Sequence, residues 1–274
     1  MHKDLTMGGY IGDKKINKAY IGDKEVKAMY LGNTKIFGSG GTIDPVLENN
    51  DWATINAVFK AGNAAKYWKV GDTKSITSKS GKTYTIRIAD MQSGRYDYAD
   101  GSGSSKGVLE FVELYNLNET TTWKMNTTTT NSGGWANSYL RNTTLPTLLE
   151  DLPDDMVGAI SEVSVLSGTG DGTTSGTSSS ANKIFIPAEM EMFDAKHNSI
   201  GIAESPLGQF DYYKAHNTDA DRIKRSVGTT NASYYYLRSP FSGTVDGFCA
   251  VSETGGWEAV TPVAPVGIGL CFAI

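Results

Sequence analysis

Histidine and cysteine are scarce in this chain. Its 274 residues include three histidines, His2, His197 and His216, and two cysteines, Cys249 and Cys271. Three histidines, one of them at the second position, are too few to suggest a metal site with three histidine ligands. Two cysteines in a chain of this size do not form a disulfide scaffold, so we expect free thiols. The sequence therefore indicates neither a metal centre nor a disulfide-stabilised fold.

The chain also lacks the usual signals of nucleotide-binding and catalytic sites. It contains no Gly-x-x-x-x-Gly-Lys-Ser/Thr loop and no Gly-x-Gly-x-x-Gly loop between a strand and a helix. We interpret residues 168–182 as a flexible loop rich in Gly, Thr and Ser. Paired carboxylates such as Glu189 and Glu191 are two residues apart, which points them to different faces on a helix and mostly into solvent on a loop, so we interpret none of them as a catalytic pair. His197 and His216 are interpreted as surface loop residues. We therefore expect a protein that is not an enzyme and that needs no cofactor.

Neither a basic cluster nor a long apolar segment is present. The formal net charge is −5 and the lysines and arginines are dispersed, which argues against nucleic acid as a partner. No stretch of the sequence approaches the roughly 18 to 20 apolar residues of a membrane helix, and the N-terminus lacks the apolar core of a signal peptide. We expect a soluble protein without membrane insertion that is made in a cytoplasm.

Glycine and small polar residues are abundant instead. The 31 glycines, together with many threonines, serines and asparagines, favour short strands and turns over a helical bundle. The length is sufficient for a full hydrophobic core. We predict an α+β fold of short strands with a few helices and long loops, preceded by a small all-β module.

That module is a repeat with a period of ten residues. Its three units begin at Tyr10, Tyr20 and Tyr30, and each consists of an aromatic residue, an aliphatic residue, a Gly-Asp or Gly-Asn turn and a second aliphatic residue. This pattern predicts miniature β-hairpins over residues 1–37. Such short strands cannot bury a core alone, so the module either packs on the body of its own chain or serves attachment and oligomerisation. A Gly-rich linker over residues 38–49 is predicted to follow it.

Residues 50–274 are predicted to form the main domain. Asn50 or Asp51 can cap a helix that carries Trp52, Ile55, Val58 and Phe59 at helical spacing. Strands are predicted over residues 68–76, 82–89, 108–114 and 183–186, a short helix from Trp135, and a helix start near Pro187.

The last forty residues combine two strand-like ends with a Gly-rich middle. Tyr236–Pro240 and Gly267–Ile274 are predicted to be scaffold, and Phe248, Val251 and Trp257 to anchor the segment between them. Its remaining side chains carry little charge and follow no helical period, which suits a binding face. The alternative is that they are ordinary loop and hairpin residues. The predicted ligand-binding residues are Ser242, Thr244, Val245, Asp246, Ala250, Ser252, Glu253, Thr254, Trp257, Glu258, Val260 and Thr261.

Several motifs, in their order along the chain, resemble those of a known domain. The motifs are Trp-Lys-Val-Gly-Asp from Trp68, Gly-Gly-Trp from Gly133, Lys-Ile-Phe-Ile-Pro-Ala-Glu from Lys183, Leu-Arg-Ser-Pro from Leu237, and the closing Val266–Phe272 segment. Together they resemble an uncharacterised domain of phage and Gram-positive surface proteins. That domain is similar to the C-type-lectin-like fold of formylglycine-generating enzymes and of variable phage receptor-binding proteins such as the major tropism determinant.

The resemblance implies a phage tail or tail-fibre tip protein. Its lectin-like domain would bind a protein or glycan receptor on a bacterial surface, with a C-terminal face that a retroelement can diversify. The N-terminal repeats resemble those at the head of phage tail proteins, which implies contact with other virion tail proteins and assembly as a homotrimer. The implied location is the virion tail.

Some features of the related proteins are missing. Formylglycine-generating enzymes use a close pair of cysteines, whereas Cys249 and Cys271 are far apart in this sequence. The calcium-dependent sugar motifs of animal lectins are also absent. A bacterial surface adhesin or a structural virion protein stays open as an alternative, and an enzyme of the formylglycine-generating type is the least favoured.

Overall fold

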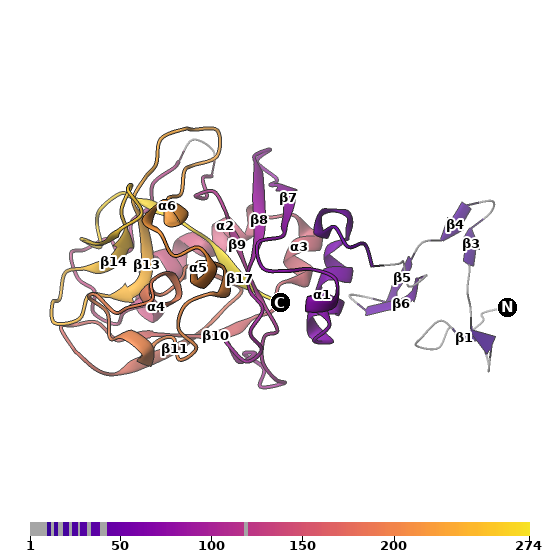
Figure 1. Cartoon of the computed structure of the whole chain (residues 1–274), viewed down its shortest axis with the longest axis horizontal. Helices are drawn as coiled ribbons and strands as arrows, with labels where there is room; N and C mark the ends of the chain where they lie inside the picture. The colour runs from indigo at the N-terminus through magenta and orange to yellow at the C-terminus, as the bar shows by residue number, and fades with distance from the viewer. Residues whose placement is uncertain are drawn as a thin grey trace. The chain divides into compact units, whose positions relative to one another are not determined.

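The computed structural model describes residues 43–117 and 120–274, together with short strands between residues 10 and 38 (Figure 1). The chain divides into two compact units, Met1–Pro45 and Val46–Ile274. The Gly-Asp and Gly-Asn turns of the predicted repeat, and residues 39–42 of the predicted linker, lie outside the described residues.

The strands of the first unit pair two by two along the chain. Each repeat of the ten-residue period contributes one antiparallel two-stranded sheet. The pairs are β1 (Tyr10–Ile11) with β2 (Lys14–Lys15), β3 (Ala19–Ile21) with β4 (Lys24–Val26), and β5 (Ala28–Leu31) with β6 (Thr34–Gly38).

The second unit contains a five-stranded antiparallel sheet in the order β12-β17-β9-β8-β7. The strands are β7 (Thr73–Thr77), β8 (Thr83–Asp90), β9 (Val108–Phe111), β12 (Ile184–Phe185) and β17 (Cys271–Ala273). Tyr84, Ile86 and Ile88 of β8 are buried, whereas Thr85 and Arg87 between them are partly exposed, which confirms the alternation predicted for this strand. The C-terminal strand β17 therefore lies inside the sheet, between β12 and β9; Figure 1 shows it beside β9.

A second sheet has the order β15-β14-β13-β16 and occupies the other end of this unit (Figure 1). Its strands are β13 (Tyr235–Pro240), β14 (Phe248–Val251), β15 (Trp257–Val260) and β16 (Gly267–Ile268). Strands β13 to β15 form an antiparallel meander, and β16 pairs in parallel with β13. β15 is thus an edge strand, and the segments predicted as scaffold flank it in sequence.

Helices and strands together make the predicted mixed α+β fold correct. The α-helices are α1 (Trp52–Lys60), α2 (Leu145–Asp151), α3 (Asp154–Ala159), α4 (Glu189–Met192), α5 (Asp211–Ala215) and α6 (Asp219–Arg222). Single turns of 3-10 helix cover Leu47–Asn49, Ala64–Lys66, Trp135–Asn137 and Gly201–Ala203, and a π-helical turn covers Leu140–Thr144. None of the helices among residues 43–117 and 120–274 has both the length and the apolar character needed to cross a membrane.

Helix α1 begins as predicted. The Asp51 carboxylate accepts a hydrogen bond from the Thr54 amide at 2.6 Å, so Asp51 is the N-cap. The predicted apolar face is buried, and Trp52 packs edge-on against Phe272 of β17 with ring centroids 5.9 Å apart. The helix therefore covers the five-stranded sheet near its C-terminal strand.

The interpretation of residues 168–182 as a flexible loop is wrong over its last six residues. Thr177–Asn182 forms strand β11, which pairs antiparallel with β10 (Val163–Gly168) along all six of its residues. All six residues of β11 are Thr, Ser, Ala or Asn, so apolar alternation cannot reveal the strand. The backbone ladder and the buried inner face of β10 specify the hairpin instead.

Gly134 occupies a conformation that only glycine adopts easily, with φ 57° and ψ −150°. A Cβ at this position would lie 1.9 Å from the Gly168 carbonyl oxygen. Because this oxygen belongs to the backbone, the main chain itself would have to shift to relieve the clash. The adjoining Trp135 is fully buried, so the close approach of these backbones fixes a core side chain.

We predict that Gly134→Ala lowers the free energy of unfolding by more than about 2 kcal/mol, because it adds both backbone strain and a steric clash. Gly158→Ala is the matched control. Gly158 lies in α3 with open space around the position of a Cβ, so alanine should raise the free energy of unfolding by roughly 0.5–1 kcal/mol. Urea denaturation measures both, and a Gly134→Ala protein as stable as wild type would contradict the prediction.

Candidate functional site

The residues predicted to bind a ligand lie in the loop 241–247 and in the β14–β15 hairpin. Val245 and Trp257 are 53% and 45% exposed. Asp246, Glu253, Thr254, Glu258 and Thr261 are also exposed, and Ser242, Thr244 and Val260 are half-buried. Two of the predictions are wrong: Ala250 is fully buried in β14 between its two neighbouring strands, and Ser252 is buried where the hairpin turns.

The exposed residues do not form one continuous face. Successive side chains of a strand point to opposite sides of the sheet, so Trp257 and Glu258 of β15 face different ways. Trp257 lies opposite Val251 of β14, and Glu258 lies opposite Ala250. The predicted surface therefore divides into a Trp257 side and a Glu258 side.

On the Trp257 side, four side chains from three separate segments form a column that we call the aromatic ladder. The His197 ring stacks on Trp257 with centroids 5.0 Å apart and an interplanar angle of 14°. Phe193 contacts His197 edge-on at 5.5 Å, and the Arg222 guanidinium lies 4.6 Å from the centre of the Phe193 ring. The ladder thus runs from a buried arginine to an exposed tryptophan, and His197 is exposed as expected.

A buried carboxylate holds the loop that carries His197. Glu189 accepts hydrogen bonds from the backbone amides of His197, Asn198 and Ser199 at 3.2, 2.9 and 3.0 Å. The Asn198 carbonyl in turn accepts a hydrogen bond from the Ser242 amide at 2.6 Å. Glu189 is therefore buried, and its carboxylate is the structural centre of this loop.

Glu191, the other member of that pair, is also fully buried and forms an ion pair with Arg238 of β13. Two guanidinium nitrogens donate to its two carboxylate oxygens, each at 2.6 Å. Tyr96 and Ser205 donate their hydroxyls to Oε1 at 2.6 and 3.1 Å, and the Ala188 amide donates to Oε2 at 2.8 Å. Burial favours the neutral acid, but Arg238 outweighs it and lowers the pKa of Glu191, so this pair is ionised.

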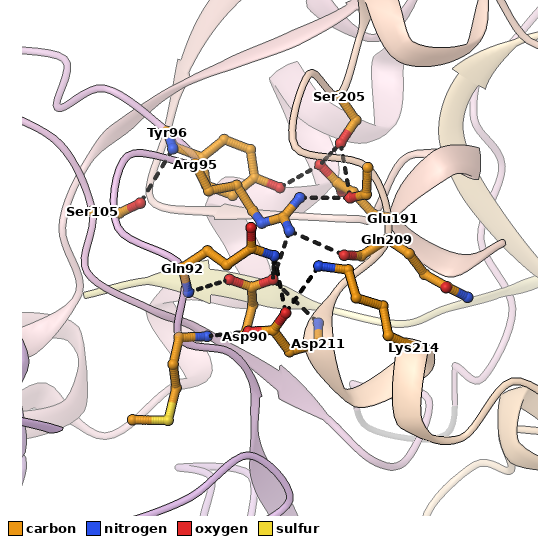
Figure 2. A network of polar contacts seen from close by, with 12 residues as sticks. Asp90, Gln92, Arg95, Tyr96, Ser105, Glu191, Ser205, Gln209, Asp211 and Lys214 are labelled. Atoms are coloured by element: carbon orange, nitrogen blue, oxygen red, sulfur yellow. Dashed lines mark hydrogen bonds and ion pairs between the residues drawn. The ribbon is translucent and has the colours of Figure 1, made fainter. Parts of the chain in front are cut away.

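A network of buried polar groups continues from this ion pair (Figure 2). Arg95 donates to Asp90 at 2.6 Å, to the Gly208 carbonyl at 2.7 Å and to the Gln209 carbonyl at 3.2 Å. Gln92 bridges Asp90 and Asp211. As Figure 2 shows, residues that follow β8 here face residues of the 191–214 segment, so the network joins parts of the chain that are distant in sequence.

Glu110 of β9 is the centre of a second buried cluster. It accepts hydrogen bonds from Arg87 at 2.6 Å, from Lys224 at 2.9 Å and from the Tyr213 hydroxyl at 2.9 Å. Burial alone would raise its pKa, but Arg87 and Lys224 lower the pKa of Glu110 to about 2. This cluster ties the five-stranded sheet to the segment that leads into β13.

Glu204 differs from these carboxylates. Its Oε2 accepts a hydrogen bond from the Gly168 amide at 2.9 Å, while its buried Oε1 makes no hydrogen bond to any described residue. Burial raises the pKa of Glu204 to about 7, against the lowering effects of the Ser239 hydroxyl and the Gly168 amide. The pKa of Glu204 is therefore shifted toward neutral pH, in contrast to those of Glu110 and Glu191.

The remaining reactive groups are shielded. Cys249 and Cys271 are free and buried, and burial raises the pKa of both thiols well above its usual range. Both thiols therefore stay protonated at neutral pH, which disfavours nucleophilic chemistry. Within the part of the chain that the structure describes, His, Cys, Asp and Glu side chains form no group of three that could hold a metal ion.

Fold and site define a mixed α+β domain in which a buried arginine–glutamate pair supports an exposed aromatic ladder. Residues 111–273 match the family described as "Domain of unknown function (DUF6273)", and the chain belongs to that family. The matched region includes Glu191, Arg238 and Trp257, whereas Asp90 and Arg95 precede it. Comparisons with curated proteins and with solved structures gave no match.

We predict that Glu191→Gln lowers the free energy of unfolding by about 3–5 kcal/mol, because it leaves the buried Arg238 charge uncompensated. Asp154→Asn is the control. It breaks the Lys79–Asp154 pair, whose side chains are 49% and 90% exposed, and should cost less than about 1 kcal/mol. Equal and small effects in urea denaturation would contradict the structural role given to the buried pair.

Glu204 should make stability depend on pH. Its folded-state pKa of about 7 exceeds the ordinary value of 4.5, so above pH 4.5 the unfolded chain ionises first and stability falls until the pH passes 7. When the pH is raised from 5 to 8, the unfolding free energy of Glu204→Gln should increase by roughly 2 to 3 kcal/mol relative to that of the wild type. Denaturation at both pH values measures this difference, and a pH-independent difference would contradict the raised pKa.

Proposed function

We propose that this protein is a non-enzymatic receptor-binding protein of a phage tail or tail fibre, attached through its N-terminal repeats. Its lectin-like domain would recognise a protein or glycan on a bacterial surface. The resemblance of the sequence motifs supports this class of protein. The structural observation that carries the proposal is Trp257, which is 45% exposed while one face of its ring stacks on His197.

An exposed tryptophan held in this way is suited to binding. Large aromatic side chains bury much area on contact and lose little conformational entropy when they are already fixed. Stacking on His197 fixes the position of the Trp257 ring, and the buried Glu189 in turn holds the loop that carries His197. The surface is therefore organised before any ligand arrives.

Polar groups surround this aromatic anchor. Glu253 and Thr254 are exposed in the turn that precedes Trp257, and Ser242 is joined to the His197 loop through the Asn198 carbonyl. An aromatic centre with a polar, solvent-accessible rim is the usual composition of a recognition surface. Ala250 and Ser252 are excluded from it, because both are buried.

We predict that Trp257→Ala weakens binding of the full-length protein to its bacterial target at least about tenfold, since central tryptophans dominate interface energetics. Labelled protein titrated onto a panel of Gram-positive cells measures the apparent affinity. Tyr67→Ala is the control, because Tyr67 is 39% exposed and follows the 3-10 turn Ala64–Lys66, far in sequence from the aromatic ladder. Equal binding by the Trp257→Ala and wild-type proteins would contradict the proposed face.

A further inference from the structure

Strand β15 forms one edge of the four-stranded sheet, and its outer side is open. In the part of the chain that the structure describes, it pairs with β14 alone. Trp257 is 45% exposed, Glu258 is also exposed, and Ala259 and Val260 are half-buried. An open edge presents backbone donors and acceptors to which a strand of another molecule can pair.

The pairing pattern shows which backbone groups of β15 point outward. Residue pairs along an antiparallel ladder alternate between those that exchange hydrogen bonds and those that do not. The Ser252 amide donates to the Gly256 carbonyl at 2.8 Å, and Glu258 lies two residues further along the same register. Glu258 therefore bonds to β14, whereas the amides and carbonyls of Trp257 and Ala259 point away from β14.

The hydrogen bonds of these outward groups agree with that pattern. The Ala259 amide donates to Oε1 of the adjacent Glu258 side chain at 3.0 Å instead of to a strand. The Trp257 amide and the carbonyls of Trp257 and Ala259 make no hydrogen bond to any residue that the structure describes. The edge thus offers both donors and acceptors, and one donor is covered by a carboxylate that a cation can attract away.

The segment around this edge carries negative charge. Residues 239–274 include Asp246, Glu253 and Glu258 but neither lysine, arginine nor histidine. All three carboxylates are exposed, and none of them forms an ion pair with a described residue. Glu258 is therefore a free negative charge in the middle of the edge strand.

Charges from the neighbouring segments do not cancel this one. Arg222, which donates to the Gly255 carbonyl at 3.1 Å, is already paired with Asp219 at 2.7 Å. The loop that carries His197 has one exposed charge of each sign, Asp194 and Lys196. The surface around β15 is therefore acidic, and it favours a cationic partner.

A second copy of the same strand is a poor partner. When two β15 strands pair antiparallel and each uses both outward residues, Trp257 of one copy lies opposite Ala259 of the other. The two Glu258 side chains then face each other, and like charges directly opposite destabilise a strand pair. A charge on an edge strand is also a common protection against self-association. Glu258 thus disfavours a second copy and favours a strand with lysine or arginine at the opposite position.

We propose that β15 binds an extended segment of a protein partner as a fifth strand of this sheet, with a basic residue of that segment opposite Glu258. The backbone of the segment pairs with Trp257 and Ala259, and Glu258 leaves the Ala259 amide for the cation. The residues on either side of the cation lie on the Trp257 face, where apolar side chains pack well. This inference rests on the proposed function and specifies the receptor as a protein rather than a glycan.

The test uses the full-length protein and short labelled peptides in which valine and threonine alternate, with the central threonine replaced by lysine, glutamine or glutamate. Fluorescence anisotropy measures the affinity of each peptide. We expect the lysine peptide to bind at least about fivefold more tightly than the glutamate peptide, and Glu258→Lys to invert that order. Failure of all three peptides to bind, equal binding of the three, or an order that Glu258→Lys leaves unchanged overturns the proposal.

Ala259→Pro tests the backbone pairing itself. Proline removes the outward amide and blocks a strand on that side, while the bonds between β14 and β15 stay intact. We expect it to weaken binding of the lysine peptide at least about tenfold, whereas Ala259→Ser, which keeps the amide, should bind like wild type. Wild-type affinity in a folded Ala259→Pro protein overturns strand addition. If Ala259→Pro does not fold, the inversion in Glu258→Lys still decides.

Cell binding separates this proposal from the proposed function. Binding to Gram-positive cells that is weakened by Trp257→Ala and abolished by protease treatment of the cells supports both. Binding that is weakened by Trp257→Ala but survives protease treatment keeps the proposed face and overturns the protein partner. Binding that Trp257→Ala leaves unchanged contradicts the proposed function, while the peptide titrations decide strand addition on their own.

Discussion

The buried pair of Arg238 and Glu191 is the interaction on which the arrangement of this domain depends. Removing two charges from water costs several kcal/mol for each, and only dense hydrogen bonding offsets that cost. Arg238 also donates to the carbonyls of Leu166 and Ile186 at 2.9 and 3.1 Å. The pair is thus stable only when β13, β10, the end of β12 and α4 have all assembled around it. A contact of this kind contributes less to net stability than to the selection of one arrangement among many.

Helix α4 connects this interior constraint to the surface. It has four residues, and its two glutamates point in different directions. Glu191 faces Arg238, whereas Glu189 satisfies three consecutive amides of the loop that carries His197. Any displacement of the ion pair would therefore move the support of that loop, and with it the stacking of His197 on Trp257. The buried charge pair and the loop that carries His197 are thus both held through α4.

Local signals in the sequence were sufficient for some of the structure. The capping Asp51 and the spacing of Trp52, Ile55 and Phe59 specify α1 within a few residues, and the alternation of β8 is equally local. The roles of Glu189 and Glu191 could not be read in the same way, because burial of Glu191 depends on Arg238, 47 residues further along. Strand β11 was not predicted, because its backbone pairing with β10 specifies it and its own residues show no apolar alternation. Ala250 was misplaced because a small residue looks the same in sequence whether it lies inside a sheet or on a loop.

Comparison of Glu191 with Glu204 shows why equal burial leads to different chemistry. Both carboxylates are shielded from water, yet a guanidinium, two hydroxyls and an amide saturate Glu191, and its charge persists. Glu204 accepts one backbone amide on Oε2, and burial then raises its pKa to about 7. Its Oε1 is shielded from solvent and accepts no hydrogen bond from the described residues. The charge of a buried carboxylate is therefore decided by the donors that surround it and not by burial alone.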